Sequence, residues 1–164
     1  MDKRQLVQQL ESQIRRAADG ALGAATEAAV EARAAADPRE RSADSGTAVE
    51  LARMAAGQQR RRDRAMAELE ALSAFDPRPL GEDARVKVGA IVEIEDTETG
   101  RGRTFFLAPA GAGSTLHGPD GDGLFTVVTP SSPVGKAVLG RRVGDVVDVT
   151  LKGEVREWEI TWVA

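Results

Sequence analysis

The segment SPVGKAVLGRRVGD, residues 132–145, carries the clearest local structural information in this chain of 164 residues. Ser132 is a favourable helix N-cap, and Pro133 follows it at the first helical position, where a backbone N–H is not needed. Gly140 suits the left-handed conformation that commonly follows the last turn of a helix. The segment therefore predicts a short helix over residues 133–139.

The residues on both sides of this helix alternate between apolar and polar side chains, as half-buried strands do. Trp158, Ile160 and Trp162 are predicted to share one face of the last strand. The Lys152-Gly153 pair before that strand predicts a hairpin turn. Strands are expected over residues 90–95, 104–108, 124–129, 146–151 and 154–163. The second half of the chain thus predicts a small antiparallel sheet with one short helix.

The first half of the chain has the three- and four-residue apolar spacing of amphipathic helices. A break rich in turn-forming residues, 37–47, separates two such helices and favours an antiparallel hairpin. The seam between them is predicted to contain Leu6, Leu10, Ile14, Ala17, Ala21, Ala24, Ala28 and Ala32 from the first helix, and Val49, Ala52, Ala56, Met66, Leu69 and Leu72 from the second. The expected facing pairs are Leu10 with Leu72, Ile14 with Leu69 and Ala17 with Met66.

The segment FDPRPLGED, residues 75–83, contains two prolines and a glycine at the point where the helical spacing changes to alternation. We therefore predict an α+β protein with an antiparallel coiled-coil arm over residues 1–74, a linker over 75–83 and a sheet domain over 84–164.

The composition excludes several classes of function. His117 is the one histidine and cysteine is absent, so the chain cannot supply a Cys/His zinc site, a thiol nucleophile or a disulfide framework. The 26 acidic side chains outnumber the 22 basic ones, whereas a duplex-DNA-binding domain usually carries a basic excess. No stretch approaches the roughly 20 apolar residues that span a bilayer, and the first residues lack a signal peptide's apolar core. We expect a cytoplasmic protein that is not itself an enzyme.

The 132–145 segment resembles the signature S-P-L-x-x-A-L-L-G-x-x-x-G-D of the C-terminal domain of the GreA/GreB transcription elongation factors. The matching positions are Ser132, Pro133, Ala137, Leu139, Gly140, Gly144 and Asp145, while valine replaces leucine at 134 and 138. VKVGAIVEIED, residues 86–96, resembles the opening strand of that domain. Residues 50–72 are similar in length and character to the family's second helix.

This resemblance implies an FKBP-like C-terminal domain that binds the rim of the RNA polymerase secondary channel, with the coiled coil extending toward the polymerase active site. Acidic residues at the tip of the family's coiled coil help to hold a second Mg²⁺ and a water, so that the polymerase hydrolyses backtracked RNA. The implied partners are RNA polymerase and the nascent RNA 3′ end. No cofactor is implied to bind stably, since the Mg²⁺ is shared with the polymerase, and a monomer is expected.

The family's tip pattern D-x-x-E corresponds here to Asp37 and Glu40, which are the candidate metal-binding residues, with Asp44 close by. Carboxylates are the hard oxygen ligands that Mg²⁺ prefers. Arg39 and Arg41 lie among them, and nearby positive charge weakens the affinity for a cation. Two alternatives follow: the arm delivers the metal and stimulates cleavage, or it occupies the channel without doing so.

Basic residues form two further candidate contacts. The candidate contact with RNA or polymerase on the second helix consists of Arg60, Arg61, Arg62 and Arg64, although a charge run on a long helix is also typical of a solvated face. In the 132–145 segment, Lys136, Arg141 and Arg142 are expected to be exposed toward the polymerase. The candidate polymerase-binding motif consists of Ser132, Pro133, Lys136, Leu139, Gly140, Gly144 and Asp145.

The remaining motifs favour structural roles. The DGDG sequence at residues 120–123 lacks the further ligands of a calcium loop. Phe105, Phe106, Phe125, Trp158 and Trp162 are expected in the core rather than in a proline-isomerase pocket. His117 is expected at the surface. A second class of function stays open, in which the FKBP-like domain and the hairpin bind a protein unrelated to transcription.

Overall fold

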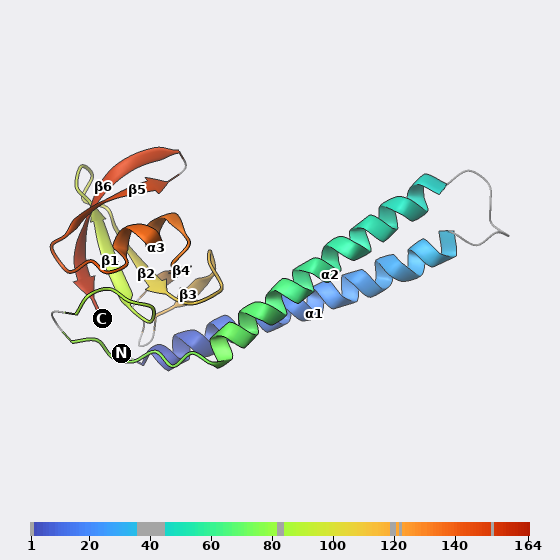
Figure 1. Ribbon diagram of the computed structural model, residues 1–164, viewed down its shortest axis with the longest axis horizontal. Helices are drawn as coiled ribbons and strands as arrows, with labels where there is room; N and C mark the ends of the chain where they lie inside the picture. The colour runs from blue at the N-terminus through green and yellow to red at the C-terminus, as the bar shows by residue number, and fades with distance from the viewer. Residues whose placement is uncertain (1, 36–44, 82–83, 119–120, 122, 152) are drawn as a thin grey trace. The chain divides into compact units, whose positions relative to one another are not determined.

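The computed structural model describes residues 2–35, 45–81, 84–118, 121, 123–151 and 153–164. Contacts divide the chain into two compact units, one formed by Met1–Glu11 with Ala71–Ala164 and the other by Ser12–Glu70. Figure 1 follows the chain by residue number. The α+β fold class predicted from the sequence is confirmed. Within the described ranges, no helix is both long enough and apolar enough to cross a membrane.

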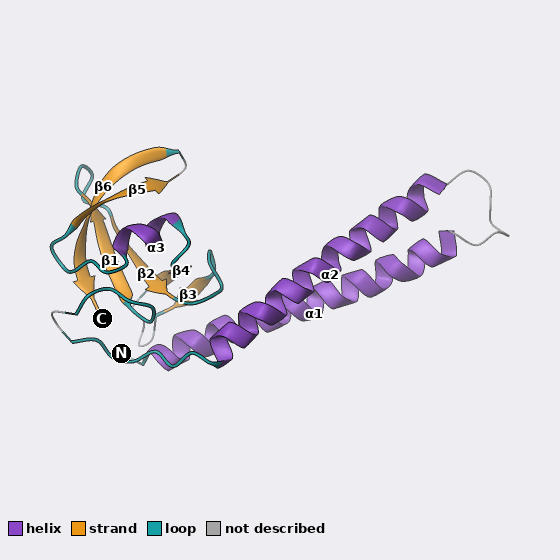
Figure 2. Cartoon of the chain, viewed as in Figure 1, coloured by secondary structure: helices purple, strands orange, loops and turns teal. Residues whose placement is uncertain are grey.

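Helices α1 (Lys3–Ala35) and α2 (Ser45–Ser73) form the predicted helical hairpin, and Figure 2 shows them as two long helices. Within the unit Ser12–Glu70, the buried seam consists of Ile14, Ala18, Ala21, Ala25, Ala28 and Ala65. Alanine side chains allow two helices to approach closely but bury little apolar area per residue. This seam therefore gains less from burial than one built from leucine.

The predicted seam of α2 is wrong at Val49, Ala52, Ala56 and Met66, which are all exposed. Val49 is 66% exposed and Met66 is 49% exposed, and Ala17, which was expected to face Met66, is exposed as well. The predicted seam joined two sets of residues, one ending at Ala56 and the other beginning at Met66. At about 100° per residue, the step between these two residues falls about 80° short of three full turns, so the two sets do not lie on one face of the helix. Most of the buried and half-buried positions instead follow a heptad: Leu51, Ala55, Gln58, Arg62, Ala65, Leu69 and Leu72.

The unit formed by Met1–Glu11 and Ala71–Ala164 contains one six-stranded sheet in the order β3-β4-β2-β1-β6-β5. Its strands are β1 (Ile91–Asp96), β2 (Gly102–Leu107), β3 (Thr115–His117), β4 (Leu124–Val128), β5 (Val146–Leu151) and β6 (Glu154–Val163). Every pair is antiparallel except β2 with β4, which is parallel. The sheet is therefore mixed rather than purely antiparallel, because β3 reverses the chain between β2 and β4. Alternation along a strand cannot predict the direction of its partner.

A compact core covers one face of this sheet. Helix α3 (Pro133–Val138) contributes Val134 and Val138, which pack with strand residues including Val92, Phe105 and Ile160. Phe105, Phe106, Phe125 and Trp158 are buried, as predicted, whereas the prediction that Trp162 lies in the core is wrong. The aromatic residues of the sheet thus supply core volume.

Trp162 does not share the face of Trp158 and Ile160, contrary to the prediction. It is 40% exposed, whereas Val163 is buried. Ile94 pairs with Ile160 but the preceding Glu93 pairs with Trp162, so β6 contains one extra residue. Such a bulge reverses the alternation beyond it, and it is not visible in a regular apolar pattern.

The first turns of α1 belong to the same unit as the sheet. Leu6 and Leu10 are fully buried. The Gln9 side-chain amide donates to the His117 carbonyl oxygen at 3.0 Å, and the His117 backbone N–H donates to Gln9 Oε1 at 3.0 Å. Leu10 lies against Gly111, where an added Cβ would come within 2.6 Å of Leu10 Cδ1. The His117 side chain is exposed, as expected.

Candidate functional site

The 132–145 segment begins with a fully capped short helix. Ser132 has extended backbone angles (φ −70°, ψ 156°), and its hydroxyl oxygen accepts from the Gly135 backbone N–H at 3.1 Å. The same hydroxyl donates to the Thr129 carbonyl oxygen at 2.8 Å. Pro133 occupies the first helical position. The predicted helix is confirmed, and it ends at Val138, one residue earlier than expected.

The turn after α3 is held by backbone hydrogen bonds to distant segments. The Gly140 N–H donates to the Val86 carbonyl oxygen at 2.8 Å, and the Val86 N–H donates to the Arg141 carbonyl oxygen at 2.8 Å. The Gly144 N–H donates to the Ile160 carbonyl oxygen at 2.8 Å. Gly140 and Gly144 have φ values of +79° and +86°, a region that L side chains rarely adopt. These contacts fix the shape of residues 139–145.

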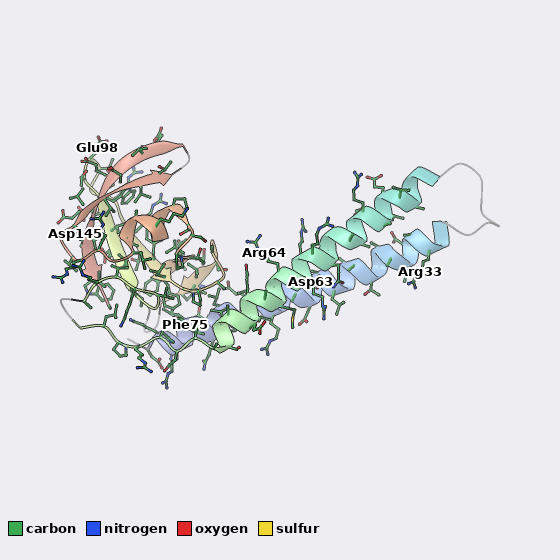
Figure 3. All side chains as sticks on the ribbon, in the orientation of Figure 1. Arg33, Asp63, Arg64, Phe75, Glu98 and Asp145 are labelled. Atoms are coloured by element: carbon green, nitrogen blue, oxygen red, sulfur yellow. The ribbon has the colours of Figure 1, made fainter. Side chains whose placement is uncertain are left out.

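Asp145 completes this turn with its side chain. Its Oδ2 accepts from the Arg142 backbone N–H at 2.9 Å, while its own backbone N–H donates to the Arg142 carbonyl oxygen at 3.1 Å. Figure 3 labels Asp145 at the edge of the sheet unit. The Asp145 carboxylate therefore stabilises the turn locally, which is a structural use of a motif residue.

The outer side of this turn combines apolar and basic side chains. Leu139 is 43% exposed and Val143 is 49% exposed, and the neighbouring cations are exposed as well. We call this set the motif surface; it consists of Lys136, Leu139, Arg141, Arg142 and Val143. Within the described part of the chain, no carboxylate forms an ion pair with its three cations. Such a surface can bury apolar area against a partner while contacting acidic groups at its rim.

Gly135 is a motif position that sequence reasoning missed. A Cβ at this residue would lie 2.8 Å from the Thr129 carbonyl carbon and would clash with the carbonyl oxygen. Glycine is required there because α3 passes directly over the chain that leads into it. No local feature of the sequence distinguishes this glycine, since the close approach depends on the cap geometry of Ser132.

The four arginines predicted to contact RNA or polymerase lie on α2. Arg60, Arg61 and Arg64 are exposed, and Arg62 is half-buried at a seam position. Arg64 Nε lies 3.3 Å from Glu68 Oε1 one turn further along, and Figure 3 shows Arg64 projecting from the helix. Arg60 and Arg64 are four residues apart and therefore lie on one face, with Arg61 beside them. The structure thus brings three of the four together on one exposed stripe.

The predicted metal-binding residues Asp37 and Glu40, with Asp44, lie outside the described residues. In the ranges that are described, no group of three or more potential metal-ligating side chains occurs.

Comparison with known proteins decides the family. The sequence model of the family described as "Transcription elongation factor, GreA/GreB, C-term" matches residues 81–164, a range that contains α3 and the whole sheet. The chain belongs to the GreA/GreB family.

Two curated relatives show the range of this family. The transcription elongation factor GreA of Ralstonia nicotianae is 29% identical over 93 residues, which cover 57% of this chain and 54% of the relative. The transcription inhibitor protein Gfh1 of Thermus aquaticus is 36% identical over 70 residues, which cover 42% of this chain and 41% of the relative. The chain thus spans about half the length of the curated relatives it matches.

A solved structure also aligns with the chain. The crystal structure of Thermus aquaticus Gfh1 is 24% identical, with a TM-score of 0.42, and the alignment covers 95% of this chain and 92% of that chain.

Proposed function

We propose that this GreA/GreB family protein regulates transcription elongation by binding RNA polymerase at its secondary channel. The single observation that carries the proposal is the motif surface, which lies within the domain that the family model matches. Exposed Leu139 and Val143 would supply the apolar contact, and the three cations around them would contact acidic groups of the polymerase. The protein would act as a monomer in the cytoplasm.

The helical hairpin would enter the channel. A helix of 29 residues such as α2 is about 44 Å long at 1.5 Å per residue. A slender arm of this length can carry side chains from an external docking site into a buried active site. The exposed stripe of Arg60, Arg61 and Arg64 would then contact the phosphates of the emerging RNA or the channel wall.

The function we favour is stimulation of RNA cleavage in backtracked complexes. Asp37 and Glu40 would contribute carboxylate ligands to a Mg²⁺ that the polymerase shares, and hydrolysis would be carried out by the polymerase. The chain itself would be neither an enzyme nor a stable metal binder.

A second candidate is a channel-binding inhibitor that does not stimulate cleavage. Arg39 and Arg41 stand beside the two carboxylates in the sequence and would weaken their affinity for a cation. One relative is named a transcription inhibitor. This candidate shares the docking step and differs only at the tip.

The first experiment mixes the purified protein with backtracked elongation complexes of its cognate RNA polymerase and follows cleavage of the RNA 3′ end. Asp37→Ala and Glu40→Ala are each expected to slow cleavage by about tenfold or more, because a ligand to the shared metal is lost. The matched control is Asp19→Ala, which removes an exposed carboxylate from α1. Equal rates for all three variants would contradict metal delivery.

Competition with an active Gre factor for the polymerase tests the docking step separately. Val143→Asp places a charge in the apolar part of the motif surface and is expected to abolish competition. A protein that competes but does not stimulate cleavage is the inhibitor. A protein that does neither refutes the link to transcription and favours an interaction module with another partner.

A further inference from the structure

On the face of the sheet that carries the apolar core, β1, β2 and β6 also carry polar side chains near one end of the sheet. Ile94 pairs with Arg103 on one side and with Ile160 on the other. Two residues further along β1, Asp96 pairs with Trp158. Directly paired residues share a face, and so do alternate residues of one strand. The face that carries the apolar core therefore continues into Asp96, Arg103 and Trp158.

A cavity of about 360 Å³ lies at this end of the sheet. Its lining residues come from β1, β2, β6 and the turn between β1 and β2; they are Asp96, Thr99, Arg101, Arg103, Glu154, Arg156 and Trp158. Small-molecule sites have volumes of roughly 300 to 1,000 Å³. The cavity is therefore large enough for a small organic molecule and too small for a folded segment of a protein.

The two carboxylates of the cavity are already paired with Arg156. Arg156 Nη1 lies 3.3 Å from Asp96 Oδ2, and Arg156 Nη2 lies 2.9 Å from Glu154 Oε2. Asp96 is 2% exposed, and its Oδ1 accepts from the Glu98 and Thr99 backbone N–H groups at 3.0 and 2.9 Å. These donors, with that of Thr99 the strongest, lower the pKa of Asp96 below its ordinary value.

Arg101 and Arg103 are the two arginines of the cavity lining that are not paired with its carboxylates. Neither forms an ion pair with another described residue, and both are exposed along the rim of the cavity. Because Arg156 is occupied by two carboxylates, these two guanidinium groups give the cavity its attraction for anions. A guanidinium group donates two parallel hydrogen bonds to the oxygens of a phosphate or a carboxylate.

Trp158 lines the cavity and also belongs to the apolar core. The residue is 4% exposed, and its buried indole Nε1 has no hydrogen-bond partner among the described residues. A buried donor without an acceptor costs about 1 to 3 kcal/mol relative to a paired one. A ligand whose acceptor oxygen contacts Nε1 would remove this penalty.

We propose that this cavity is a binding site for the phosphate group of a small molecule. Arg101 and Arg103 would hold the phosphate oxygens, and Trp158 would donate to an acceptor of the same ligand. Phosphate is favoured over a single carboxylate because two free guanidinium groups match its double negative charge. A volume of about 360 Å³ favours a small molecule over a nucleic-acid strand. The site does not depend on polymerase binding, so either proposal can fail without the other.

The test follows the indole N–H resonances of the ¹⁵N-labelled full chain while inorganic phosphate or phenyl phosphate is added at constant ionic strength. Trp158 is expected to give a saturable shift, whereas Trp162, outside the cavity, provides an internal reference. Trp162→Phe assigns the two resonances. Equal affinity for the two probes indicates a site for free phosphate. Tighter binding of phenyl phosphate indicates a phosphorylated small molecule, and either result supports the proposal.

The variant Arg103→Gln is expected to weaken the binding by about tenfold, and Arg101→Gln with Arg103→Gln by more. Arg33→Gln, the matched control on α1, is expected to leave the affinity unchanged. Retained amide dispersion shows that each variant is folded, and Arg103→Gln alone serves if the double variant is not. Shifts that rise linearly for both tryptophans, or a Trp158 shift that saturates with wild-type affinity in Arg103→Gln, overturn the proposal. A shift produced by single-stranded RNA but by neither phosphate probe also overturns it.

Discussion

Lys3 is a buried cation whose replacement should make the protein more stable. Its side chain is 5% exposed, and its Nζ donates to the Arg78 carbonyl oxygen at 3.3 Å. No carboxylate pairs with it in the described ranges. Burial, together with the nearby charge of Lys87, lowers the pKa of Lys3 from 10.5 to about 8.

The difference between these two pKa values corresponds to about 3 kcal/mol of free energy. Below pH 8 both the folded and the unfolded chain carry the proton, and folding bears the full cost of the buried charge. Between about pH 8 and pH 10.5 the unfolded chain binds more protons, so the free energy of unfolding should rise with pH. Lys3→Met keeps an unbranched side chain and removes the charge. It should stabilise the protein at neutral pH by about 1 to 2 kcal/mol, because the lost hydrogen bond to Arg78 offsets part of the gain.

Urea unfolding followed by tryptophan fluorescence measures this effect, because Trp158 and Trp162 lie in the same unit as Lys3. The measurement is repeated from about pH 7 to about pH 10.5. Lys136→Met, which removes an exposed cation from α3, is the matched control and should keep the wild-type slope. If wild type and Lys3→Met show the same dependence on pH, the reasoning from burial is refuted.

Three further substitutions test the packing and the charges of the sheet unit. Gly135→Ala should lower the free energy of unfolding by about 1 to 3 kcal/mol, because its Cβ clashes with the Thr129 carbonyl group, and urea unfolding at wild-type stability would contradict the close approach. Leu10→Ala should cost about 2 to 5 kcal/mol, because the side chain is fully buried, whereas Leu22→Ala at a 43% exposed site of α1 should cost about 0.5 kcal/mol or less. Asp96→Asn should remove an acid-dependent part of the stability. The lowered pKa of Asp96 gives the wild type stability that is present above the ordinary value of 3.8 and is lost as the pH falls through the folded-state pKa, so unchanged acid unfolding of the variant would refute its pairing.

Local rules predicted the elements of the motif because each depends on residues next to one another. Helix α3 begins after the N-cap Ser132, with Pro133 at its first position, and the chain leaves the helix at Gly140. All three signals lie within nine residues of one another. The same reasoning could not find Gly135 as a required glycine, since the obstructing atom belongs to Thr129 and reaches it only through the folded cap.

Long-range register was the main source of error. Two stretches of α2 each have a helical period but are out of phase, so Val49 is exposed while Leu69 and Leu72 lie in the seam. Trp162 lies on the opposite face from the one predicted, because an extra residue in β6 shifts the pairing of this strand with β1. Neither a phase nor a bulge can be read from a window of a few residues.

The sequence by itself determined the helical hairpin, every described strand except β3, the capped helix α3 and membership of the family, because periodicity, caps and a motif are local properties. Only the tertiary structure decided which residues gather from distant positions. It placed Leu10 against Gly111, made β4 run parallel to β2, and brought Arg101, Arg103 and Trp158 to one cavity. These contacts depend on strand order and register, and many distant pairings are compatible with the same local pattern.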